Sequence, residues 1–560
     1  METFAKLSYV RPEMETIMSD VKAITKTMET AASWEEFKNA YMDWVKLDME
    51  LSTARTIVHI RNTVDMLDEF YEAENSYFNA QMPRYGVLVK EMGTAILNSP
   101  YRARMEEEFG KILIQNMEAQ RLLSSEAVVE DMARESDLAG LYSKTVAAAT
   151  ADFRGEPCTT YSLLKHMKST DRGERREAFE AWASLYESIS PKIDEIYGEL
   201  VSLRVGMAKK LGFDSYTPMG YLKRRRYDYK PEDMEVFRRQ VREVIVPACV
   251  KLFERRRKAL GIEKLHYYDE SVSGPEGNAV PVGDKDYMVE KARQMYRELS
   301  PETGEFFDFM VEHELFDLET KKGKRVGGYC TMLPLYHAPF IFSNFNGTAA
   351  DVNVLTHEAG HGFAGFTAAK FQSLPELCHS TSEINEIHSM GMELWTYPWM
   401  ESFFGEKAGQ YRRDHLIEAL MVIPYMVCVD EFQHKVYENP DMSPMEWRAV
   451  WRQLEETYMP WRDYDGNKFL SEGGFWMQKQ HIFLYPFYYV DYAIAQIGAF
   501  EFYTWMKKDR KAAWEGYYEL CRMGGSLGYF DLLEHCGLHN LLKEGSVKEA
   551  LKAVFEELEV

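Results

Sequence analysis

Two histidines and a glutamate with helical spacing give the strongest sign of chemistry in this sequence. Residues 357–361 read H-E-A-G-H, which places His357 and His361 four positions apart. On an α-helix, residues four apart share a face, so both imidazoles could bind one metal ion. Zinc suits two neutral imidazoles and a carboxylate, with a fourth position for water that becomes acidic enough to attack a carbonyl. Glu358 lies one step round the helix and could act on that water as a base.

The flanking sequence predicts that this motif lies on a buried helix. Thr348 and Asp351 have the spacing of a capping box, and the Asn346-Gly347 pair before them is typical of a turn. Gly360 and Gly362 lower helix propensity, but small residues there would let another backbone or a substrate approach closely, or they serve packing alone. The apolar residues recur at three- and four-residue steps, at Val352, Leu355, Ala359 and Phe363. The competing interpretation is that the two histidines are ordinary helix residues without a role in metal binding.

A third protein ligand is needed, and spacing alone leaves several candidates open. A metzincin would have a histidine at position 367, where this chain has Thr367. An acidic stretch at residues 380–393 could instead supply a carboxylate from a second helix, as in a thermolysin-type site with two histidines and one glutamate. The candidates in and beside this stretch are Glu383, Glu386, Glu393, His379 and His388.

A change of pattern before the motif predicts a small β-structure beside the motif helix. The runs Tyr329–Leu333 and Phe340–Phe342 are β-like, and two prolines separate them. The runs indicate either a structural hairpin or a sheet edge. An exposed edge could pair with the backbone of an extended peptide.

Several segments resemble the thimet oligopeptidase and oligoendopeptidase F family of zinc metallopeptidases. These segments are G-G-Y-C at 327–330, F-I-F-S-N-F-N-G-T at 340–348, H-E-A-G-H-G-F at 357–363, N-E-I-H-S-M at 385–390, and the tyrosine-rich stretch at 481–492. The likeness covers the chain from about residue 200 to its end. Within the family, the chain is most similar to bacterial oligoendopeptidase F and Pz-peptidase enzymes.

The resemblance implies one zinc ion per chain, with His357, His361 and Glu386 as its ligands and Glu358 as the general base. It also implies a mainly α fold, similar to neurolysin and thimet oligopeptidase. That fold is a large, clam-like body of two lobes with a deep substrate channel and a small β-sheet beside the metal helix.

The tyrosine-rich stretch holds four tyrosines within residues 485–492. A buried aromatic cluster is the default interpretation. Phenol hydroxyls and an imidazole could instead stabilise the oxyanion that forms when water adds to a peptide carbonyl. The stretch departs from the thimet branch, because the spacing from its histidine to its tyrosines is one residue shorter. The resemblance implies catalytic roles for His481, Tyr492 and Tyr489, and substrate contacts at Gly327, Gly328, Tyr329 and Tyr485.

Composition indicates the compartment and the partners. The net charge of −23 argues against nucleic acid and against anionic membranes as partners. The seven cysteines are scattered and form no C-x-x-C pair, which predicts free thiols in a reducing cytosol. Neither a signal peptide nor a membrane-spanning run is visible. We therefore expect a cytoplasmic protein whose partners are oligopeptide substrates, and the oligomeric state stays open.

Helical periodicity over most of the chain predicts two helical domains. We expect an N-terminal helical lobe at residues 1–200 and a catalytic zinc metallopeptidase domain at 201–560. Two basic runs, Lys223–Arg226 and Arg255–Lys258, are interpreted as solvated faces or loops in preference to binding sites. The stretch Ser271–Asp284 is rich in Ser, Gly and Pro and predicts an exposed loop.

The sequence thus predicts a zinc-dependent endopeptidase that hydrolyses short oligopeptides in an enclosed channel by glutamate-assisted attack of water. The alternative enzyme is a zinc carboxypeptidase or dipeptidyl carboxypeptidase that trims C-termini. Such an enzyme needs a cation for the substrate carboxylate, and the chain has many. A third hypothesis is a peptide-binding protein without catalysis, against which the intact Glu358 argues.

Overall fold

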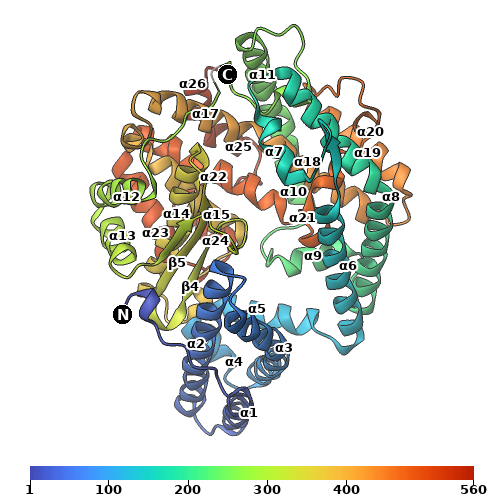
Figure 1. The fold of residues 1–560 in the computed structure, drawn as a ribbon. Coiled ribbons are helices and arrows are strands. Elements are labelled where there is room, and N and C mark those ends of the chain that lie inside the picture. The colour runs from blue at the N-terminus through green and yellow to red at the C-terminus, as the bar shows by residue number, and fades with distance from the viewer. Residues whose placement is uncertain (276) are drawn as a thin grey trace. The chain divides into compact units, whose positions relative to one another are not determined.

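The computed structural model describes residues 1–275 and 277–560 (Figure 1). The predicted loop at Ser271–Asp284 includes residue 276, which lies outside the described residues. The chain is mainly α-helical, as predicted, and divides into two compact units. Unit 1 comprises Met1–Leu122, Ala279–Gly409 and Trp505–Leu538, and unit 2 comprises Leu123–Asn278, Gln410–Thr504 and His539–Val560.

Unit 1 combines an N-terminal block of helices with a second group of helices around a three-stranded sheet. The helices of the N-terminal block are α1 (Met14–Thr30), α2 (Trp34–Val64), α3 (Glu69–Asn98), α4 (Arg102–Phe109) and α5 (Lys111–Leu123). The other helices are α12 (Lys285–Leu299), α13 (Pro301–Glu312), α14 (Ala349–Phe371), α15 (Ser382–Trp395), α16 (Glu401–Phe404), α23 (Arg510–Met523) and α24 (Tyr529–His535). The strands are β3 (Phe316–Glu319), β4 (Tyr329–Leu333) and β5 (Ala338–Phe345).

The sheet of unit 1 has the order β3-β5-β4, so the long strand β5 lies in its centre. Strand β4 pairs with β5 in antiparallel register, with Tyr329 opposite Phe342, and β3 pairs with β5 in parallel. Almost every residue of β5 is buried, because helix α14 packs against it. The sequence prediction of a small sheet beside the motif helix is therefore confirmed.

Helix α14 carries the H-E-A-G-H motif and begins where the sequence predicted. The carboxylate of Asp351 accepts hydrogen bonds from the backbone N–H groups of Asn346 and Gly347, at 2.7–3.1 Å. These contacts satisfy backbone donors before the first turn. The hydroxyl of Thr348 does not cap the helix as a capping box requires, because it donates to the side chain of Asn346 instead.

Helices α14 and α15 pack against each other (Figure 1), and they approach closely at Gly360, as the contacts of this residue show. A methyl group at this position would lie 2.6 Å from Cα of Ser389 and 2.7 Å from the carbonyl oxygen of His388. Helix α15 therefore packs directly on the backbone of α14. The segment between the two helices is anchored by the N-terminal block, since Leu374 and Leu377 lie in its apolar core.

The regular structure in the described residues of unit 2 consists of helices and one short hairpin. Its helices are α6 (Val129–Ala148), α7 (Thr160–Leu164), α8 (Arg172–Lys210), α9 (Tyr216–Lys223), α10 (Pro231–Gln240), α11 (Val246–Ala259), α17 (Ala408–Met421), α18 (Ile423–Glu438), α19 (Pro444–Tyr458), α20 (Lys468–Ser471), α21 (Gln480–Leu484), α22 (Tyr489–Lys508), α25 (Ser546–Ala550) and α26 (Lys552–Leu558). The hairpin joins β1 (Ala151–Phe153) to β2 (Glu156–Cys158), and a π-helical turn at Val241–Ile245 connects α10 to α11.

The core of unit 2 is rich in aromatic side chains, in which Tyr197 packs against Trp447, Trp476 and Phe483. Helix α8 runs through residue 200, and the division into 1–200 and 201–560 stays a prediction. Among the described helices, none combines the length and the apolar character that crossing a bilayer requires.

The contact at Gly360 makes a prediction about stability. Gly360→Ala should destabilise the protein by about 1–3 kcal/mol, because the added methyl group overpacks the interface between α14 and α15. Thermal unfolding followed by circular dichroism measures the effect. The matched control is Gly86→Ala in α3 of the same unit, where a methyl group meets no atom within 4 Å. If both variants unfold at the same temperature as the parent protein, the close packing at Gly360 is not needed.

Candidate active site

Three side chains from two helices of unit 1 converge on one point. In α14, the Nε2 atoms of His357 and His361 each lie 3.4 Å from Oε2 of Glu386 in α15. Ligands bound tetrahedrally to zinc at 2.0–2.1 Å are separated by about 3.4 Å, so the spacing fits such an ion. Within the described part of the chain, these three residues form the group of His, Cys, Asp or Glu donors whose ligand atoms all lie within 4.8 Å of one another.

Two neighbouring side chains orient the donors. Nδ1 of His357 lies 2.7 Å from Oε1 of Glu393, which directs Nε2 of the same ring towards Glu386. The hydroxyl of Ser389 lies 2.9 Å from Oε2 of Glu386. Carboxylates that accept a hydrogen bond from a metal-binding histidine fix its tautomer and raise its basicity. Glu393 thus has the geometry of a supporting residue, whereas the sequence left it open as a ligand.

The electrostatics of this group are dominated by charge pairing. Burial alone would lower the pKa of His357, but its hydrogen bonds to Glu386 and Glu393 raise that pKa well above its ordinary value. Burial alone would raise the pKa of Glu386, but the hydrogen bonds from the two histidines hold it far below its usual range. The cluster therefore keeps an ionised carboxylate beside two imidazoles, which suits a divalent cation.

Glu358 is buried beside strand β4. A methyl group at Gly328 would lie 3.7 Å from Oε1 of Glu358 and 3.4 Å from the carbonyl oxygen of Phe342. Burial raises the pKa of the Glu358 carboxyl, although the positive charges of His357 and His361 oppose the rise. A carboxylate with a raised pKa is a better proton acceptor at neutral pH.

The predicted substrate-binding segment before β4 has a fixed backbone. Gly327 has φ of +107°, a conformation that favours glycine, and the side-chain amide of Asn344 donates to its carbonyl oxygen at 2.8 Å. The hydroxyl of Tyr329 lies 2.6 Å from Oγ1 of Thr63 in α2. Tyr329 is therefore held by the N-terminal block, and its contact with substrate stays a prediction, as do those of Gly327 and Gly328.

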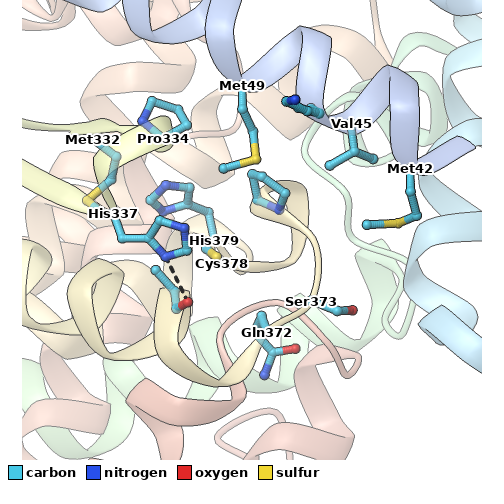
Figure 2. A pocket seen from close by; sticks show the side chains of 13 residues that line it. Met42, Val45, Met49, Met332, Pro334, His337, Gln372, Ser373, Cys378 and His379 are labelled. Carbon is cyan, nitrogen blue, oxygen red and sulfur yellow. Dashed lines mark hydrogen bonds between the residues drawn. The ribbon is translucent and has the colours of Figure 1, made fainter.

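The remaining candidates for a third metal ligand do not join the group. Glu383 and His388 are buried elsewhere along α15, and burial lowers the pKa of His388 to about 3. His379 lines an apolar cavity of about 300 Å³ beyond the C-terminal end of α14 (Figure 2). Figure 2 shows methionines of α2 and β4 facing this cavity, together with His337, whose Nδ1 lies 3.0 Å from the carbonyl oxygen of Ala369.

The tyrosine-rich stretch belongs to unit 2 and forms a compact cluster there. The ring of His481 lies 4.7 Å from that of Tyr489 and 6.4 Å from that of Tyr492, measured between centroids. Burial lowers the pKa of His481 to about 3, and Lys479 and Arg224 add to the effect, so its imidazole is neutral. Tyr485 is half exposed.

Sequence reasoning missed Tyr488, which is the hydrogen-bond partner of Tyr492. Their hydroxyl oxygens are 2.9 Å apart. The four-residue spacing of the two tyrosines was a usable signal, because it places them on one face of a helix.

The sequence matches the description Peptidase family M3 over residues 165–277 and 303–550, and Peptidase M3 N-terminal domain over residues 4–123. The chain belongs to peptidase family M3. It is therefore a metalloendopeptidase, as the sequence predicted.

Individual relatives agree with this assignment. The M3 chain is 21% identical to oligopeptidase PepF of Bacillus subtilis over 551 residues, which is 92% of this chain and 79% of that protein. It is similar to a solved structure of Pz peptidase A with an inhibitor, with 43% identity, a TM-score of 0.91 and 99% coverage of both chains. A structure assigned as oligoendopeptidase F from Bacillus anthracis has 39% identity and a TM-score of 0.87, covering 100% of this chain and 98% of its own.

The donor geometry predicts how single substitutions change metal binding. Glu386→Ala should lose most of the metal, because one of three protein donors is removed. Glu393→Gln should weaken metal affinity by only about 10- to 100-fold, because Glu393 orients His357 and is not itself a donor. Metal content after dialysis, and titration against a metal buffer, measure both effects. The control is Glu383→Gln, a buried change on the same helix outside the donor group, which should stay fully loaded. A fully loaded Glu386→Ala protein would contradict the site.

Proposed function

We propose that this M3 peptidase is a zinc-dependent endopeptidase that hydrolyses short oligopeptides by glutamate-assisted attack of water. The observation that carries the proposal is the convergence of His357, His361 and Glu386, with Glu358 buried one residue from the first histidine. Two imidazoles and one carboxylate are the donor set of a catalytic zinc site with an open position. When bound there, zinc would lower the pKa of a water molecule and polarise a peptide carbonyl.

In this proposal Glu358 moves the proton. Its carboxylate accepts a proton from the attacking water and then delivers it to the amine that leaves. Burial favours the first of these steps, because it raises the pKa of the Glu358 carboxyl and so makes its carboxylate a better proton acceptor. Glu393 holds the imidazole of His357 in one orientation through its 2.7 Å contact with Nδ1.

We also propose that Tyr492 donates a hydrogen bond to the oxyanion that develops on the scissile carbonyl, with His481 and Tyr489 as further members of this group. Support comes from the family likeness of this stretch. The neutral imidazole of His481 adds to it, because its buried Nδ1 has no hydrogen-bond partner among the described residues. A donor aimed at developing charge contributes more in the transition state than in the ground state.

The proposed substrates are short peptides without folded structure, and the named relatives, an oligopeptidase and an oligoendopeptidase F, support this class. A cytosolic location is proposed from the cysteines, all seven of which are free thiols. Tyr485 and the glycines before β4 are proposed as substrate contacts.

The proposal is tested with an internally quenched peptide blocked at both ends. The enzyme should cleave it, because an endopeptidase needs no free terminus, whereas a carboxypeptidase would leave it intact. A chelator should abolish cleavage and added zinc should restore it. Glu358→Gln should keep the metal and reduce kcat by about 100- to 10,000-fold, the usual contribution of acid–base catalysis. Folded globular proteins serve as the negative substrate, and their rapid cleavage at many sites would refute the restriction to short peptides.

The oxyanion role predicts a specific kinetic signature. Tyr492→Phe should lower kcat by about 100-fold or more and leave KM within a few-fold, as expected for an interaction made mainly in the transition state. Steady-state kinetics and metal content measure this. The control is Tyr464→Phe, which removes another tyrosine hydroxyl of unit 2, one that donates to Glu455. Near-normal turnover of Tyr492→Phe would assign the tyrosine cluster to packing.

A further inference from the structure

The basic run Lys223–Arg226, interpreted from sequence as a solvated face or loop, is not solvated at its end. The side chain of Arg226 has no exposed surface, and that of Asp491 has 1%. Nη2 of Arg226 donates to Oδ1 of Asp491 at 2.5 Å and to the carbonyl oxygen of Phe487 at 2.6 Å. The interpretation of the basic run as solvated is therefore wrong for Arg226. A buried charge of this kind requires a partner, and the partner is part of the tyrosine-rich stretch.

The two acceptors of Arg226 lie on either side of the start of helix α22. Phe487 has φ of +62°, which is unfavourable for a residue with a side chain, so surrounding contacts must hold it. Its backbone N–H donates to Oε1 of Gln433 at 3.0 Å. Its ring fills the space above Gly220, where a methyl group would lie only 2.7 Å from Cδ2. The turn that leads from His481 to the tyrosines is thus held by three contacts, with Arg226, Gln433 and Gly220.

A second arginine of the same run connects this turn to the tyrosine hydroxyls. The guanidinium of Arg224 lies 4.3 Å from the ring centroid of Tyr488 and 3.4 Å from Oδ2 of Asp491. Tyr488 in turn exchanges a hydrogen bond with Tyr492 at 2.9 Å. Asp491 immediately precedes Tyr492 on α22, so the contacts that hold Asp491 also restrain the first turn of the helix that carries that tyrosine.

We infer that Arg226 is a positioning residue for the tyrosine cluster: with Asp491, and with Arg224 against Tyr488, it fixes the turn at Phe487 and thereby aims the hydroxyl of Tyr492. The inference rests on the proposed oxyanion role of Tyr492. It gives the run at 223–226 a function in turnover, although Arg226 contacts neither substrate nor metal in this proposal.

The decisive experiment is a double-mutant cycle in the full-length, metal-loaded enzyme. Arg226→Lys keeps the charge, but lysine lacks the planar guanidinium, whose geometry places Nη2 against both the Asp491 carboxylate and the Phe487 carbonyl oxygen. It should lower kcat about tenfold with KM within a few-fold, since coupled groups act as a unit. In a Tyr492→Phe background, the same change should lower kcat less than about twofold, because the hydroxyl that it aims is already absent. Asp491→Asn provides a second, milder change at the same contact and should follow the same pattern.

The matched control is Arg175→Lys. Arg175 is another buried arginine of unit 2 that also pairs with a carboxylate, Asp269 at 2.8 Å, and donates to backbone carbonyl oxygens, those of Tyr268 at 2.8 Å and Ser169 at 2.7 Å. It should lower the unfolding temperature without a change in kcat that depends on residue 492. Equal losses of kcat from Arg226→Lys and Asp491→Asn in both backgrounds would overturn the inference and leave the proposed function standing. Near-normal kcat of Tyr492→Phe alone would overturn the oxyanion role, and the inference with it.

Discussion

The arrangement of the site depends on one close contact between two helices. Gly360 lies between the two histidines along α14, and its missing side chain lets the backbone of α15 approach to a distance that any larger residue would block. That approach brings Glu386 within 3.4 Å of both Nε2 atoms. Because packed interiors resist even one extra methyl group, the separation of the helices is fixed by this position. The sheet packs on α14, and the N-terminal block holds the segment that joins the two helices.

Burial and charge pairing shift the pKa values of this site in opposite directions. Which effect is the larger differs between neighbouring residues. At His357 the two carboxylates outweigh burial, so the pKa rises. At Glu358 burial outweighs the two histidines, so the pKa also rises, but here the result is a stronger base. A proton and a divalent cation therefore compete for the same imidazole, as is general for metal sites built from titratable ligands. Helix α14 thus carries two imidazoles of the donor group and, directly after the first of them, a proton acceptor.

Local sequence patterns predicted the parts of this structure that local geometry determines. The positions of His357 and His361 follow from the period of a helix, and the β-like runs became β4 and β5. The third donor could not be derived in this way, because three glutamates of α15 share the same stretch and only the packing of α15 on α14 distinguishes them. Glu386 was named from family resemblance. Arg226 was misinterpreted for a similar reason, since its partner Asp491 lies 265 positions away along the chain.

In unit 2, the geometry of the tyrosine-rich stretch likewise depends on packing between segments that are far apart in the chain. Helix α21 has five residues, which is too short to be stable alone, so tertiary contacts must fix His481. Phe483 supplies one of them, because its ring stacks on Tyr142 at 3.9 Å. Beyond it, the strained turn at Phe487 sets where α22 begins. Composition reveals which polar groups are present in such a segment. Their direction is determined by the buried residues around them, because neither a short helix nor a left-handed turn keeps its geometry without support.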